Sequence, residues 1–210
     1  MDHDTRTKAA TEQDPKLAGR IVRSLKQVED DAYMASGPLS ERLMSAIVQS
    51  IKQAVPEPFN VVETDWTASI TAPDWKATRG VGQDFSLTLA EIGAEEEGRE
   101  YSWLTAATAI GPTRLGIEFS CRPGLREAFA GVVASEQKMA ALYKAGFVLD
   151  VTDGRLFVPI VIAKLADAFE KNDLSSAMAP VTKAVQQVVA AKPELDKIAE
   201  AIRVAAKVNK

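Results

Sequence analysis

The sequence has a single histidine, His3, and a single cysteine, Cys121, among its 210 residues. A Ser-His-Asp triad or a Cys-His pair needs a histidine beside the nucleophile, and a structural zinc site needs several His or Cys ligands. One cysteine cannot close an internal disulfide. Any catalysis would therefore depend on carboxylates, Lys, Arg or Tyr, and the sequence favours a protein that is not an enzyme.

Long apolar runs are also missing. Residues 1–13 are polar, and no stretch approaches the roughly 18 consecutive apolar residues of a membrane helix. We therefore expect no signal peptide, no membrane span and a cytoplasmic location. The net charge of −4 at pH 7 disfavours non-specific coating of nucleic acid, although a local basic surface would still permit binding.

What the sequence does contain is typical of a folded protein, with 46% hydrophobic and 26% charged residues. We expect residues 1–13 to form a disordered tail and Asp14-Pro15 to start a helix. Apolar residues then recur every three or four positions, which predicts a helix over 15–34. Ser36-Gly37-Pro38 should break it, and a second helix should follow and end at Pro56. The apolar stripe of the first helix is Leu17, Ile21, Leu25, Val28 and Ala32.

From Phe59 the apolar residues alternate with a period of two, which is typical of half-buried strands. We expect one strand over 59–70 and a second over 85–89. The stretch 100–122 is predicted to be a central hairpin of two strands joined by Gly111-Pro112-Thr113. A last hairpin is indicated by Asp153-Gly154 between two short apolar runs.

The remaining segments have helical periodicity. Helices are predicted at 125–146, ending at Gly146, and at 159–171, 173–191 and 193–208. In the last of these, Leu195, Ile198, Ile202 and Ala205 form a narrow seam of the kind that packs against another helix.

Segregated strands and helices predict an α+β fold. We expect a largely antiparallel sheet of about four to six strands covered by helices, with an N-terminal helical pair and a C-terminal helical segment. The predicted α+β domain spans residues 14–172. Residues 173–210 are the C-terminal segment, which either packs on the domain or serves assembly.

Two acidic residues on predicted strands, Asp84 and Glu118, are the candidate metal ligands, because one carboxylate from each of two strands can hold Mg²⁺. The predicted order helix-strand-strand-strand-helix-strand is loosely similar to the PD-(D/E)XK nuclease superfamily. In Glu118-Phe119-Ser120 and Glu100-Tyr101-Ser102 a serine stands where that family has the lysine that helps position the attacking water. The resemblance implies a nuclease-like core, active or degenerate, with Mg²⁺. Otherwise we expect no cofactor, and both acids would be strand residues paired with Arg or Lys.

Three further residues are candidates for binding. Arg122 lies on the same strand face as Glu118, where the two could clamp an anion or small ligand, although most such pairs are surface ion pairs. Arg155 would reach phosphate if the helix at 125–146 and the hairpin after it acted as a winged helix. Trp75 lies in a predicted loop between two charged residues, so we expect it to be exposed and to anchor an interface.

Three functions remain open. The first is a non-enzymatic regulatory or interaction protein that binds another macromolecule, by self-association or through a partner protein. The second is a nucleic-acid-processing protein that uses Asp84 and Glu118, and the third is a small-ligand sensor with a pocket beside Glu118 and Arg122.

Overall fold

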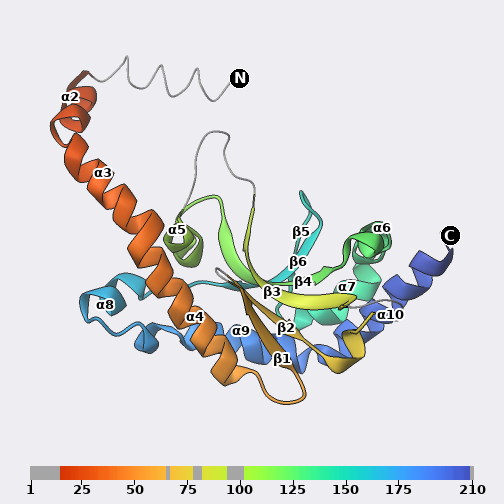
Figure 1. Ribbon diagram of the computed structural model, residues 1–210. Coiled ribbons are helices and arrows are strands. Elements are labelled where there is room, and N and C mark those ends of the chain that lie inside the picture. The colour runs from red at the N-terminus through yellow and green to blue at the C-terminus, as the bar shows by residue number, and fades with distance from the viewer. Residues whose placement is uncertain (1–14, 65–66, 78–81, 94–101, 209–210) are drawn as a thin grey trace.

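The computed structural model describes residues 15–64, 67–77, 82–93 and 102–208 (Figure 1). Its centre is a six-stranded antiparallel sheet in the order β1-β2-β3-β4-β6-β5. The strands are β1 (Asn60–Thr64), β2 (Thr67–Thr71), β3 (Phe85–Ile92), β4 (Arg114–Cys121), β5 (Val148–Asp150) and β6 (Arg155–Ile160). The predicted α+β fold is therefore confirmed.

Helices precede the first strand, follow the last strand and also lie between strands along the chain. The α-helices are α2 (Pro15–Arg23), α3 (Leu25–Met34), α4 (Ser40–Ala54), α5 (Trp103–Thr108), α6 (Arg126–Val133), α7 (Glu136–Lys144), α8 (Leu165–Glu170), α9 (Ala179–Ala190) and α10 (Lys192–Val208). Short turns of other helix types are η1 (Ala35–Leu39), η2 (Pro73–Trp75), η3 (Pro123–Leu125) and η4 (Ser175–Ala177).

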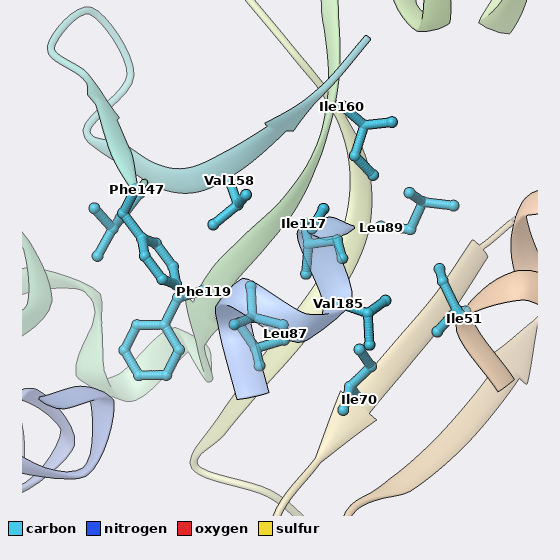
Figure 2. Close-up of a cluster of buried hydrophobic side chains, with 14 of the residues drawn as sticks. Ile51, Ile70, Leu87, Leu89, Ile117, Phe119, Phe147, Val158, Ile160 and Val185 are labelled. Carbon is cyan, nitrogen blue, oxygen red and sulfur yellow. The ribbon is translucent and has the colours of Figure 1, made fainter. Parts of the chain in front are cut away.

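One face of the sheet carries the hydrophobic core. Leu87 and Ile117, on neighbouring strands, are fully buried and alternate with polar residues. Figure 2 shows Val185 of α9 and Ile51 of α4 beside the inward side chains of the strands. Helices α4 and α9 therefore help to cover one face of the sheet, in agreement with the period of two in β3 and β4.

The helix predicted over 15–34 is divided at Ser24, whose φ of −106° and ψ of 14° are not helical, into α2 and α3. Both lead away from the sheet (Figure 1). The predicted break at Ser36-Gly37-Pro38 is wrong, because α3 continues into α4 through the π-helical turn η1, which contains Pro38. A π turn widens the helix by one residue, so it accommodates the proline ring and its missing N–H. The hydroxyl of Ser40 donates to the carbonyl of Ala35 at 2.7 Å and supports this turn.

Two strand predictions are wrong. The segment 59–70 is not one strand but the hairpin β1–β2. The pairing sets Val61, and not Val62, on the face of Ile70, so the alternation expected of one strand shifts between β1 and β2. The segment expected to be the first strand of the central hairpin is helix α5, because its consecutive alanines, Ala106 and Ala107, pack into the core and favour helix. The second strand of that hairpin is β4, as predicted.

The C-terminal half follows the prediction with three changes, one of which is that the helix expected at 173–191 begins only at Ala179 as α9. The helix expected at 125–146 is divided into α6 and α7, and it ends as predicted at Gly146, which has a φ of 97°. The hairpin at Asp153-Gly154 is confirmed as β5–β6. The helix expected from Pro159 begins only at Leu165 as α8, because pairing with β4 extends β6 to Ile160.

The close contact between β4 and β6 at Gly116 provides a test of this packing. A Cβ at Gly116 would lie 2.6 Å from Cδ2 of Phe157 and 3.0 Å from the carbonyl oxygen of Val158. Gly116→Ala should therefore lower the free energy of unfolding by roughly 1–3 kcal/mol, measured by urea denaturation. Gly131→Ala in α6 is the matched control: nothing lies within 4 Å, so it should leave stability unchanged or raise it. Equal effects of the two changes would contradict the register.

Candidate functional site

A buried carboxylate joins the sheet to the last helix. Asp84, directly before β3, is only 1% exposed. Nε of Arg122 donates to its Oδ1 at 2.6 Å, and Nε of Arg203 from α10 donates to its Oδ2 at 3.0 Å. Nη2 of Arg203 also donates to the backbone carbonyls of Asp74 and Lys76. Both oxygens of the buried charge are therefore paired, as burial in a low-dielectric interior requires.

A second polar cluster lies at the start of the same helix. Nζ of Lys192 donates to Asp196 at 2.7 Å and to Asp74 at 3.1 Å. Burial lowers the pKa of Lys192, but the hydrogen bonds to Asp196 and Asp74 outweigh it, so the pKa is raised. Trp75 donates its indole N–H to Asp196 at 2.9 Å. Together with the Asp84 contacts, this cluster joins η2 to α10.

The expected exposure of Trp75 is wrong. Its side chain is 1% exposed, and its ring lies edge-on to Phe119 at 5.6 Å and to Phe59 at 6.3 Å between ring centroids. The turn η2 directs the indole into the core, and the polar N–H finds its partner 121 residues away. A buried side chain with a satisfied N–H offers no surface to anchor an interface.

Glu118 and Arg155 form a separate pair on β4 and β6. Nη2 of Arg155 donates to Oε2 of Glu118 at 2.7 Å, and Nη1 donates to the carbonyl of Glu91 at 2.8 Å. The hydrogen bond to Glu118 raises the pKa of Arg155. The guanidinium of Arg155 is therefore used in contacts with β3 and β4. To bind phosphate as part of a wing, it would have to leave these contacts and point toward the ligand.

The structure does not bring Asp84 and Glu118 together. The backbone N–H of Arg122 donates to the carbonyl of Asp84, so the two acids are offset by four residues along β4, about 13 Å. Each carboxylate is instead neutralised by arginine. Arg122 pairs with Asp84 and Arg155 with Glu118, so Glu118 and Arg122 do not form the expected clamp. Over the described ranges, no group of three or more His, Cys, Asp or Glu could hold a metal ion.

A row of hydroxyl groups crosses the face of the sheet opposite the core. Ser69 and Thr88 lie 3.1 Å apart, Thr88 and Ser86 3.2 Å, and Ser86 and Ser120 3.1 Å, measured between side-chain oxygens. All four residues are half-buried and bonded to one another. The alternation of Ser and Thr with apolar residues in β3 was the sequence signal for this face.

Two grooves lie elsewhere on the surface. The first, of about 610 Å³, separates α6 and α7 from the β5–β6 hairpin and is lined by Val133, Tyr143, Phe147 and Val148. The second, of about 590 Å³, lies between α4 and α9 and is lined mainly by polar residues such as Gln49 and Gln186. Neither includes Glu118 or Arg122, so neither is the pocket expected beside that pair.

The C-terminal seam is used inside the chain. Leu195, Ile198 and Ile202 are between 0 and 4% exposed and belong to the hydrophobic core. In Figure 1 α10 lies against the same body as α6 and α7. The C-terminal segment was expected either to pack on the domain or to serve assembly, and its buried seam supports packing on the domain. The buried side chains of the seam are not available to another protein.

The surface that sequence reasoning missed is the N-terminal helix. The stripe over 15–34 was predicted, but without any assigned role. None of the ten residues of α3 is buried. The exposed fractions are 42% for Ile21, 72% for Val22, 48% for Leu25 and 48% for Val28. An amphipathic stripe usually indicates packing on the core, whereas this one extends past the body that would cover it.

Comparison with known protein families, with characterised proteins and with solved structures finds no match to this chain. Among the described helices, none is long and apolar enough to cross a bilayer.

The Asp84 cluster predicts a large loss of stability when its charge is removed. Asp84→Asn leaves Arg122 and Arg203 partly buried without their anion, so the free energy of unfolding should fall by about 3–5 kcal/mol in urea denaturation. Glu194→Gln, which removes the exposed pair with Lys197 on the same helix, is the control and should cost less than about 1 kcal/mol. A small effect at Asp84 would show that α10 is held by its apolar seam alone.

Cys121, at the end of β4, is half-buried. Burial raises the pKa of its thiol to about 11 from an ordinary value of 9.0, against the opposing charge of Arg126. At neutral pH the thiolate is therefore scarce, and a nucleophilic role is disfavoured.

Thiol reactivity should follow this shift. At pH 8 the thiolate fraction should be about a hundredfold lower in the folded protein than in the unfolded chain, so reaction with an aromatic disulfide reagent should slow by at least about that factor. Between pH 8 and 10 the folded rate should keep rising about tenfold per pH unit, while the rate in urea levels off near pH 9. A folded rate that levels off near pH 9 would contradict the raised pKa.

Proposed function

We propose that this protein is a non-enzymatic interaction protein that binds another protein through α2 and α3. The observation that supports this proposal is an apolar stripe in which Ile21, Leu25 and Val28 are 42%, 48% and 48% exposed, on helices of which α3 has no buried residue. Exposed apolar side chains are ordinary when scattered, but a continuous row of them marks an interaction surface.

The stripe has the spacing that helix recognition uses. Ile21 near the end of α2 and Leu25, Val28 and Ala32 on α3 step by four, three and four, which is the spacing of one helix face. Such rows enter a groove or pack against another helix. Since Ile21, Leu25 and Val28 are about half exposed, covering each of them should contribute on the order of 1 kcal/mol.

Helix stability supports the same conclusion. A helical segment of about 20 residues gains most of its stability in a protein from packing of its apolar face. In α2 and α3 the covalent continuation into η1 and α4 supplies one ordered end, and in-helix contacts such as Lys26 to Asp30 supply further support. A partner would supply the apolar packing that this chain itself does not provide for α3.

A protein suits this surface better than nucleic acid does. The basic residues of α2 would attract phosphates, but Glu29, Asp30 and Asp31 of α3 would repel them. The stripe that the partner would cover, from Ile21 to Ala32, is apolar. The nuclease-like alternative would need Asp84 and Glu118 to exchange their arginines for a shared cation across about 13 Å.

Site-specific photo-crosslinking in the native host tests the proposal. A benzophenone amino acid at Val22, which is 72% exposed, should give covalent adducts to protein at higher mass, because the partner covers this helix. The same group at Val161, which is 44% exposed and lies just after β6, is the matched control and should give far less. Failure to obtain adducts at Val22 above the Val161 level would refute the proposed function.

A further inference from the structure

The exposed helix carries its charges in two blocks. Every charged residue from residue 16 to residue 26 is basic, and every one from residue 29 to residue 34 is acidic. The basic block is Lys16, Arg20, Arg23 and Lys26, and the acidic block is Glu29, Asp30 and Asp31. The apolar stripe runs through both blocks, so any partner that covers it must face both signs of charge in this order.

We propose that the partner of this helix is a second copy of the same chain, and that α2 and α3 of the two copies pair antiparallel about a two-fold axis. This inference rests on the proposed function, because it names the protein that covers the stripe. An antiparallel pair sets the basic block of each copy beside the acidic block of the other, whereas a parallel pair sets like charges together. The surface is therefore complementary to itself in one orientation only.

The apolar spacing sets the register of the pair. The steps of four, three and four are those of a seam between two helices. Placing Leu25 opposite Val28 of the second copy also places Ile21 opposite Ala32 of the second copy. By symmetry each contact occurs twice. In an antiparallel pair, each side of the seam faces the same side of the other helix, and charge pairs form along these two edges.

That register brings opposite charges to the edges of the seam. On one side of the seam, Arg20 lies within two residues along the helix axis of Asp31 of the second copy. Lys26 comes equally close to Glu29 of the second copy, on the other side. Two residues of helix rise are about 3 Å, which long basic side chains span easily.

The two bodies remain apart in this arrangement. At the rise of a helix, α2 and α3 with Ser24 between them extend over at most about 30 Å. In the proposed register the start of α2 reaches only as far as η1 of the second copy, where the helix meets the body. Since α2 and α3 extend away from the sheet, the two bodies lie at opposite ends of the pair (Figure 1).

Light scattering of the full-length chain over a range of concentrations tests the self-association. The mass should approach twice 22.6 kDa as concentration rises, and high salt should weaken the association by screening the charge pairs. A chain that stays at 22.6 kDa throughout would overturn the proposal.

Charge reversal tests the orientation. The double variant Arg20→Glu with Lys26→Glu turns most of the helix acidic, and Glu29→Lys with Asp31→Lys turns most of it basic. Either variant alone should raise the dissociation constant of the dimer by about a hundredfold or more, because like charges then meet across the seam. An equal mixture of the two should recover a dimer that contains one of each.

The matched control changes the same amount of charge elsewhere. Lys138→Glu with Lys144→Glu, on the exposed face of α7, should leave the dimer intact. Circular dichroism should show that every variant is folded, since α3 buries nothing on which the body depends. A dimer that survives both helix variants, or a mixture that stays monomeric, would also overturn the proposal.

The two proposals fail in different ways. Adducts from Val22 to some other protein, together with a monomer in light scattering, would leave the proposed function standing and remove the self-association. A monomer with no adducts at Val22 would remove both.

Discussion

The buried charge of Asp84 is the constraint on which the arrangement of the chain depends. A carboxylate that is 1% exposed requires cationic partners, and they come from two places far apart in sequence, Arg122 after β4 and Arg203 in α10. Once both are in place, the beginning of β3, the end of β4 and the last helix hold one relative position. Arg203 also lies over the ring of Phe85, 5.3 Å from its centroid, which fixes the helix against the core.

This constraint decides which surfaces remain for other molecules. Because α10 is held at both ends, through Lys192 and through Arg203, its apolar seam is buried in the chain's own core. In the N-terminal helical segment, by contrast, none of the ten residues of α3 is buried. The N-terminal and C-terminal helical segments have similar apolar patterns in the sequence. In the structure α10 completes the core, whereas the apolar row of α3 stays exposed.

Much of the fold follows from local patterns. The period of two predicted β3, β4 and the inward face of each, and Gly146 and Asp153-Gly154 predicted the helix end and the hairpin beside them. The failures have local causes as well. The alanine-rich stretch that forms α5 has the alternating pattern of a strand in the sequence, but in the structure it is a helix with buried alanines. Pro38 predicts a helix break, but the π-helical turn η1 accommodates it.

The sequence by itself determined the fold class, the amphipathic helices and the scarcity of His and Cys chemistry, because periodicity and composition are properties of short stretches. Only the tertiary structure decided which apolar stripes are covered. It also decided that Trp75 is a core residue, and that Asp84 and Glu118 belong to separate arginine pairs and do not share a site. The physical reason is that burial and ion pairing are set by contacts between residues 37 to 121 positions apart, and no local pattern in the sequence records such contacts.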